Sequence, residues 1–458
     1  MASGGRGRDR LHRDMVLKAT KDDAVTRLRE ILRTNRESRR GGTYAVCSSH
    51  PAVIEAALQQ SLADGSLLHL ESTSSQVNQF GGYTKSTPSQ FAQWIHSKAK
   101  TIGLPASQLL LGGDHLGPFP WRNEDTATAM EKACGLVRDC VAAGYQKIHL
   151  DTSMGCADDP KPAISERTIA SRAARLCHAA EEAYRQLRSD SHQPVYVIGT
   201  EVPTPGGETQ DTEAPLVTGA DDVHRTLEVF RHAFLELGLD AAWERVIALV
   251  VQPGVEFGSN SIFEYDRAKA APLSAALQSH PGIVYEAHSS DYQTQQALTY
   301  MVEDHFAILK VGPWLTFAYR EAVLALSAVE RELHQNTSGQ RISGVREALE
   351  EAMLQDPTHW RPYYQGEDQE LRRDRAYAYS DRCRYYWHHA GVQEGITRLI
   401  DNLSTRPIPL TLISQFLPLE YQAIRAGALR ALPEQLVQHH VRNVLAVYAD
   451  ACSVKRSA

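Results

Sequence analysis

The sequence predicts a (β/α)8 TIM barrel of the α/β class, followed by an additional α-helical C-terminal region. Three observations predict it: eight short apolar runs within residues 43–312, amphipathic stretches between these runs, and helical patterning after about residue 335. The runs are rich in Leu or β-branched residues and end in polar or small residues, as buried parallel strands do. We expect an N-terminal tail and leading helix over 1–40, a barrel over 41–335 and a helical region over 336–458.

The expected strands alternate with helices whose ends carry recognisable signals. Pro51 can open the first crossover helix, which stops near Gly65. Thr87 and Pro88 provide an N-cap and a first-turn proline, and Gly103 closes that helix. The expected strands are 43–48, 67–72, 109–114, 147–152, 195–201, 246–252, 283–288 and 307–312.

An open doubly wound sheet is the alternative architecture. Its first strand should lead into a Gly-rich phosphate loop, and the segment CSSHPAV that follows the first run is not one. An eighth helix over 320–334 completes the barrel pattern. The C-terminal helices are expected at 344–354, 370–387, 391–403, 410–417 and 433–452.

Composition restricts the function classes. Of 458 residues, 42% are apolar, and the net charge of -7 argues against a nucleic-acid-binding protein, which needs a basic face. No apolar run approaches 18 residues, so we expect no membrane span. The basic start lacks the apolar core of a secretory signal, and the seven scattered cysteines fit free thiols in a reducing cytoplasm, where we expect the protein.

Chemistry-bearing side chains gather where the expected strands end. In parallel barrels the carboxyl ends of the strands meet at one mouth, which holds the active site. Carboxylates or imidazoles at five of these eight ends form the pattern of a metal and acid/base site. The candidates are Ser48, Glu71, Ser72, Asp114, His115, Asp151, Glu201, Gln252, His288, Ser289, Asp291 and Lys310.

Two histidines and a carboxylate are ordinary ligands for a divalent ion such as Zn, Mn, Co or Ni. His115, His288 and Glu201 therefore form the expected metal site, with Gln252 as a weaker fourth ligand. A single strand-end histidine could equally be an oriented core residue. Asp114 and Asp151 are candidates for a general base or an orienting group, and capping of the next helix is the alternative for each.

The remaining candidates are expected to contact substrate. Ser48, Ser72 and Ser289 could hydrogen-bond sugar hydroxyls or a phosphate, although ordinary turn hydroxyls would look the same. Glu71, Gln252 and Asp291 are grouped with them as substrate-binding residues. Lys310 could pair with a phosphate, form a Schiff base or balance a barrel carboxylate.

Several long segments carry a family resemblance. They include YAVCSSHPAVIEAAL, LESTSSQVNQFGGYT, LGGDHLGP, KIHLDTSMGCADDP, GTEVPTPGG, YEAHSSDYQ, LKVGPWLTFAYREA and YSDRCRYYW. From about Gly41 onward the chain resembles the non-catalytic, Z-type subunit of class II tagatose-1,6-bisphosphate aldolase. Members of that family include accessory subunits and 4-epimerases of sugars or sugar phosphates.

The chain is also similar, more distantly, to catalytic class II aldolases. That resemblance assigns the general base to Asp114, metal ligation to His115 and His288, and the family's glutamate position to Glu201. The chain departs from the pattern at Gln252, where those enzymes keep a histidine. It departs again after His288, where they keep a Gly-rich phosphate turn. Both departures argue against bisphosphate aldolase activity and leave the metal site intact.

Chemistry selects among the activities of the family. The C4 proton of a 2-ketose is not adjacent to the carbonyl, so inversion there needs transient oxidation or C3–C4 cleavage and rejoining. The sequence has no GxGxxG after a strand, so we expect no NAD. We therefore expect an enzyme, a metal-dependent 4-epimerase of fructose- or tagatose-type ketoses or their 6-phosphates. The alternative is a non-catalytic subunit that stabilises a tagatose-bisphosphate aldolase. The expected protein partners are a catalytic aldolase subunit or a second copy of this chain.

Overall fold

Eight parallel strands close into a barrel in the order β1-β10-β9-β6-β5-β4-β3-β2. The computed structural model describes residues 23–161, 163–187, 192–200, 215–334 and 341–453. All eight predicted strands are confirmed within these ranges. The strands are β1 (Thr43–Val46), β2 (Leu68–Thr73), β3 (Leu109–Leu116), β4 (Lys147–Leu150), β5 (Val195–Gly199), β6 (Val246–Val251), β9 (Val284–Ala287) and β10 (Ile308–Val311).

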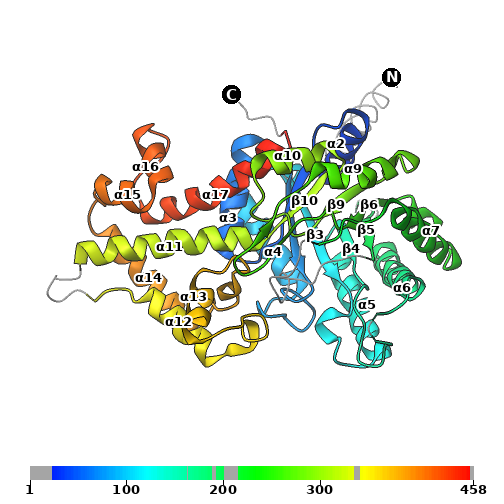
Figure 1. Cartoon of the computed structure of the whole chain (residues 1–458), viewed down its shortest axis with the longest axis horizontal. Coiled ribbons are helices and arrows are strands. Elements are labelled where there is room, and N and C mark those ends of the chain that lie inside the picture. The colour runs from blue at the N-terminus through cyan, green and yellow to red at the C-terminus, as the bar shows by residue number, and fades with distance from the viewer. Residues whose placement is uncertain (1–22, 162, 188–191, 201–214, 335–340, 454–458) are drawn as a thin grey trace, which may run out of the picture.

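Helices surround the barrel on its outer side (Figure 1). The residues predicted to start and end α4 do so. Thr87 caps α4 in a reciprocal capping box, and Gly103 ends it in the left-handed conformation at φ 86°. A small antiparallel pair, β7 (Glu256–Phe257) and β8 (Ile262–Phe263), follows β6. The surrounding helices are α3 (Pro51–Asp64), α4 (Pro88–Ile102), α5 (Thr126–Ala142), α6 (Glu166–Arg185), α7 (Ala220–Glu236), α8 (Asp240–Trp243), α9 (Arg267–Ala276), α10 (Gln295–Glu303) and α11 (Pro313–His334).

The leading helix α2 (Ala24–Ser38) closes the amino-terminal end of the barrel. Its buried Leu28 and Leu32 belong to the same apolar cluster as the first residues of β5 and β10, Val195 and Ile308. Because this end is sealed by apolar packing, polar side chains of the barrel interior are reached from the opposite end, where the strands finish.

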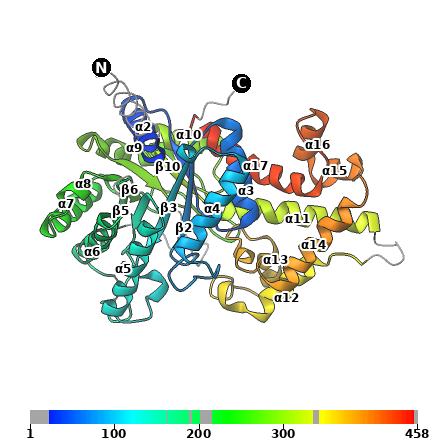
Figure 2. The ribbon, with the colours of Figure 1, turned by 180° about the vertical axis from the view of Figure 1, so that it is seen from behind.

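The C-terminal helices form a region beside the barrel, which α11 joins to it (Figures 1 and 2). The last helix, α17, returns to the barrel and packs on α3, α10 and α11. None of the helices in the described part of the chain combines the length and hydropathy that crossing a lipid bilayer requires. The helices are α12 (Val345–Gln355), α13 (Asp368–Tyr377), α14 (Ala390–Ser404), α15 (Leu410–Phe416), α16 (Pro418–Arg425) and α17 (Pro433–Ala451).

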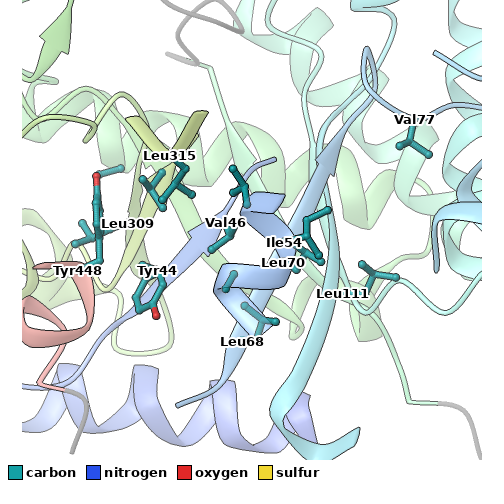
Figure 3. Close-up of a cluster of buried hydrophobic side chains, with 14 of the residues drawn as sticks. Tyr44, Val46, Ile54, Leu68, Leu70, Val77, Leu111, Leu309, Leu315 and Tyr448 are labelled. Carbon is teal, nitrogen blue, oxygen red and sulfur yellow. The ribbon is translucent and has the colours of Figure 1, made fainter. Parts of the chain in front are cut away.

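Apolar packing joins α17 to the barrel wall. Tyr448 of α17 lies near Tyr44, Leu309 and Leu315 in Figure 3. Its hydroxyl also donates a hydrogen bond of 2.7 Å to the carbonyl oxygen of Ser290, directly beyond β9. The C-terminal region is thereby fixed beside the mouth of the barrel.

The continuous helix predicted for residues 370–387 is wrong. Helix α13 ends at Tyr377, and the chain forms a 3-10 turn over Arg382–Tyr385. Between them Asp381 has the left-handed φ of 47°, and its carboxylate accepts hydrogen bonds from Arg320 (2.7 Å) and Thr316 (2.6 Å) of α11. A buried ion pair from a distant helix therefore overrides the local helical pattern.

Candidate active site at the carboxyl ends of the strands

Four charged side chains fill the centre of the barrel. Glu71 of β2 accepts from Lys147 of β4 at 2.6 Å and also from Lys310 of β10. Lys147 lies 2.6 Å from Glu286 of β9 as well. Burial opposes ionisation of Glu71, but the two lysines hold its pKa well below the usual range. The four side chains thus form a compensated charge layer beneath the mouth.

Lys310 connects this layer to the mouth. Its Nζ lies 2.9 Å from Oδ1 of Asp114, at the end of β3. Burial would lower the pKa of Lys310, but Asp114 and the carboxylates below it hold that pKa well above the usual value. Burial likewise opposes ionisation of Asp114, yet His115, Lys310 and His149 hold its pKa well below the usual range. An ammonium therefore faces a carboxylate at rest.

Three imidazoles lie above the charge layer. The ring centroids of His115, His149 and His288 are separated by 4.9 Å (His115 to His288) and by 5.2 Å for each of the other two pairs. Burial lowers the pKa of His288 to about 4, so this ring is neutral near pH 7. Within the described residues, Nε2 of His149 is buried without a hydrogen-bond partner. A neutral imidazole or an unpartnered ring nitrogen is what a metal ion requires.

Carboxylates set the orientation of two of these rings. Asp151 Oδ2 accepts from His115 Nδ1 at 2.8 Å, because a carboxylate only accepts. Nδ1 of His149 lies 2.9 Å from Asp114 Oδ1 and 3.2 Å from the backbone nitrogen of His115, so its Nε2 is the ring nitrogen without a partner among the described residues. This carboxylate–histidine arrangement is the one that supports metal-ligating histidines.

The backbone at the end of β3 brings Asp151 to His115. His115 adopts a left-handed φ of 48° where the β3–β4 register shifts. Two residues later, a Cβ on Gly117 would lie 1.6 Å from the carbonyl oxygen of Asp151. Only glycine permits this approach. The segment GGDHLGP therefore supplies the His115 side chain and also the glycine that lets the backbone of Asp151 come close to it.

The residues present fit a divalent ion. One potential ligand atom from each of Asp114, His149, Glu286 and His288 lies within 4.8 Å of the others, and all four residues are buried. The ring of His115 lies against this group. Imidazole nitrogens with one or two carboxylate oxygens suit Zn or a similar first-row divalent ion.

The structure brings together six of the predicted site residues, which are Glu71, Asp114, His115, Asp151, His288 and Lys310. Glu201, the third predicted ligand, lies outside the described residues. The Oε1 of Gln252 accepts from the backbone N–H groups of Gly254 (2.8 Å) and Val255 (3.1 Å). The side chain of Gln252 therefore holds a turn after β6.

The predicted serines and Asp291 make local contacts. Ser48 accepts from the backbone N–H of His50, and Ser72 pairs with the hydroxyl of Tyr145. Ser289 donates to Glu256 at 3.1 Å. Asp291 accepts from the backbone N–H groups of Gly312 (2.9 Å) and Trp314 (2.8 Å), at the start of α11. Burial raises the pKa of Asp291 to about 6.

Three residues of the cluster, His149, Glu286 and Lys147, were not predicted from the sequence. A signal was present: Lys147, His149 and Asp151 alternate along one strand, and Glu286 and His288 alternate along another. Polar residues two apart in an otherwise apolar strand point to the same side of the sheet, which here is the barrel interior.

A cavity of about 1010 Å³ opens above these groups. Asp114, His115, His288 and Lys310 line its barrel side, and residues of the C-terminal region line the other side. A space of this size admits a ligand considerably larger than a metal ion.

Fold and site together define a (β/α)8-barrel protein with a cluster of imidazoles and carboxylates at the carboxyl ends of its strands. The family model described as "D-tagatose-1,6-bisphosphate aldolase subunit GatZ/KbaZ-like" matches residues 28–453. The chain therefore belongs to the GatZ/KbaZ-like family, and it is related to tagatose-bisphosphate aldolase.

One solved structure is closely similar to this chain and another is distantly similar. A protein from Sinorhizobium meliloti 1021, described as a "probable tagatose 6 phosphate kinase", is 42% identical, with a TM-score of 0.81 over 90% of this chain and 100% of that one. The YdjI aldolase from Escherichia coli K12 is 9% identical, with a TM-score of 0.41 over 82% of this chain and 98% of that one. The second likeness carries no argument about function.

Proposed function

We propose that this protein is a metal-dependent 4-epimerase of ketoses or ketose 6-phosphates that works by retro-aldol cleavage and rejoining. The observation that carries the proposal is the group of three buried imidazoles with an unpartnered Nε2 on His149, placed directly above the Asp114–Lys310 pair. A divalent ion bound there would supply Lewis acidity at the C2 carbonyl oxygen of the substrate.

Asp114 is suited to take the proton of the C4 hydroxyl. Its Oδ1 is occupied by His149 and Lys310, whereas Oδ2 lies 3.7 Å from His115 Nε2 and is the oxygen left to accept from the substrate. Lys310 keeps Asp114 ionised at rest, as a base must be. After bond rotation or presentation of the other aldehyde face, the same carboxyl returns the proton to the new C4 oxygen.

Lys310 itself is a poor nucleophile. A Schiff base requires a neutral amine, and the carboxylates of Glu71 and Asp114 hold Lys310 as the ammonium. This favours the Lewis-acid form of aldol chemistry over the Schiff-base form. Lys310 instead balances the charge of Asp114 before the proton transfer.

The family description supports a second candidate. An accessory subunit would stabilise a catalytic aldolase chain and would be inert alone. A set of oriented imidazoles opening into a large cavity is not needed for that role, which is why the epimerase is preferred.

One assay separates the two functions. The purified chain alone, with Mn, Co, Ni or Zn, is given fructose, fructose 6-phosphate and tagatose 1,6-bisphosphate, and the products are separated by chromatography. The epimerase predicts tagatose or tagatose 6-phosphate without any partner chain. Inertness with every metal and sugar, together with stimulation of an added aldolase, would establish the accessory role.

Metal analysis provides a matched test of the site. His149→Ala, His115→Ala and His288→Ala should each lose bound metal and activity, because each removes one buried imidazole. His232→Ala is the control, because His232 is an exposed histidine of α7 and is not one of the clustered imidazoles. Full metal content in all three site variants would exclude the proposed ligands.

A further inference from the structure

The wall of the cavity opposite the imidazoles carries positive charge. It includes Arg382 and Arg384 of the 3-10 turn in the C-terminal region, with Tyr385 beside them and Tyr83 from the barrel side. The rings of Tyr83 and Tyr385 pack at a centroid distance of 5.0 Å. This wall belongs to the same cavity as Asp114 and His288.

Arg384 retains donors for a ligand. Its Nη1 donates to the carbonyl oxygens of Ser380 (2.5 Å) and Asp381 (3.1 Å), and its Nη2 donates to the hydroxyl of Tyr385 (2.9 Å). A guanidinium has five N–H donors, so two remain after these three bonds. Among the residues that the structure describes, no carboxylate lies within 4.0 Å of this guanidinium.

Three other buried arginines in the described part of the chain, Arg245, Arg320 and Arg375, are each paired with an acid. The separations are 2.7 Å for Arg320 and Asp381, 2.6 Å for Arg245 and Glu181, and 2.5 Å for Arg375 and Glu350. A guanidinium inside a protein is normally paired because desolvation of an uncompensated charge is costly. Arg384 faces the cavity without such a carboxylate partner among the described residues, which points to an anion supplied by a ligand.

The neighbouring groups reinforce the charge. Arg382 lies over the ring of Tyr363, with its guanidinium carbon 3.3 Å from the ring centroid. Burial would raise the pKa of Tyr385, but the charges of Arg384 and Arg382 lower it. The cavity wall at this turn therefore favours negative groups. Lys310 cannot serve the same purpose, because Glu71 and Asp114 already compensate it.

We propose that Arg384, with Arg382 and the hydroxyl of Tyr385 beside it, binds the anionic end of the substrate, so that the true substrate is a ketose ending in a phosphate ester or a carboxylate. This rests on the proposed function and assigns the C-terminal region a part in substrate selection. A planar fork of donors suits both anions, because phosphate and carboxylate each offer paired oxygens.

Kinetics on three substrates test the assignment. The parent chain, Arg384→Gln, Arg384→Lys and the control Arg361→Gln are assayed with fructose, fructose 6-phosphate and fructuronate. Arg361 is the matched control because it is an exposed arginine of the same region that lies against Trp360. Loss of a hydrogen-bonded charge partner should lower kcat/KM for the preferred anionic ketose by at least about thirtyfold in Arg384→Gln, mainly through KM.

The losses of kcat/KM on the three substrates distinguish a phosphate site, a carboxylate site and a structural role for Arg384. A selective loss on fructose 6-phosphate identifies a phosphate site, and a selective loss on fructuronate identifies a carboxylate site. Arg384→Lys should lose less than Arg384→Gln, because it keeps the charge without the fork. An equal loss on fructose and on both anionic ketoses would make Arg384 a structural residue of the turn and would overturn the proposal.

Titration calorimetry with inorganic phosphate gives a readout that does not depend on turnover, and thermal melting checks that each variant folds. Phosphate should bind the parent and Arg361→Gln and bind Arg384→Gln far more weakly. If no chain epimerises any sugar but this binding pattern holds, the anion site stands and the proposed function fails. If phosphate binds parent and Arg384→Gln equally, and the anionic ketoses are turned over equally by both, the anion site is wrong and the epimerase stands.

Discussion

Replacement of Asp151 by asparagine should weaken the metal site without removing a ligand. Asp151 Oδ2 accepts from His115 Nδ1 at 2.8 Å, and Oδ1 accepts from the backbone N–H (3.1 Å) and hydroxyl (2.7 Å) of Ser153. Both oxygens thus face donors, so the NH2 group of an asparagine must face one of them. If it faces His115, the ring must move its hydrogen to Nε2 and lose the lone pair there.

The expected loss follows from this geometry. Removing a carboxylate that orients a ligating histidine typically costs about 10- to 100-fold in metal affinity, or roughly 1.4–2.8 kcal/mol. Competition with a chelator, using Co or Zn, measures the affinity directly. Ser153→Ala is the control, because it leaves the bond between Asp151 and His115 in place. Unchanged metal affinity in Asp151→Asn, with a large fall in kcat, would instead make Asp151 a base.

Two further predictions concern stability. Lys147→Met leaves Glu71 and Glu286 without the cation they share at 2.6 Å, so denaturant titration at pH 7 should show a loss of about 3–5 kcal/mol, and parent-like stability would contradict the charge layer. Burial would lower the pKa of His440, but the hydrogen bonds that its ring donates to Glu321 and Glu420 raise it to about 9. The charged His440 therefore stabilises the fold fully below its unfolded-state pKa near 6.5, and this stabilisation is lost as pH rises through 9. The difference in melting temperature between the parent and His440→Gln should be large at pH 6 and absent above pH 9.5. A difference that does not depend on pH would contradict this role of His440.

The barrel could be predicted from sequence because each of its strands is a short apolar run with a polar end. The runs at 246–252 and 283–288 became β6 and β9, and helix signals such as Thr87 and Gly103 fixed the crossover between two others. The helix expected over 370–387 failed because its interruption depends on Arg320, a partner far away in sequence. Local periodicity contains no information about such a contact.

The mouth of the barrel was only partly predictable. Asp114, His115, Asp151 and His288 share a strand-end position, and barrel topology alone implies that they meet. His149 lies inside a strand, and the alternation with Lys147 and Asp151 is the sequence signal that could have placed it on the inward face.

The residues lining the far wall of the cavity were not predictable either. Arg384 reaches the cavity through the folding of the C-terminal region against the barrel, which no motif near it encodes. Gln252, by contrast, was predicted at the site from its strand-end position, and its side-chain oxygen accepts a hydrogen bond from the backbone of its own loop.

The central claim is that this chain inverts C4 of a ketose by breaking and remaking the C3–C4 bond. The most direct measurement compares the rates at which the purified chain, loaded with metal, converts unlabelled fructose 6-phosphate and fructose 6-phosphate deuterated at C4. Cleavage and rejoining of C3–C4 predict nearly equal rates and a tagatose 6-phosphate product that keeps its deuterium at C4, because the C4–H bond is never broken. A several-fold slower reaction of the labelled sugar, loss of deuterium to water, or absence of any epimer would contradict it.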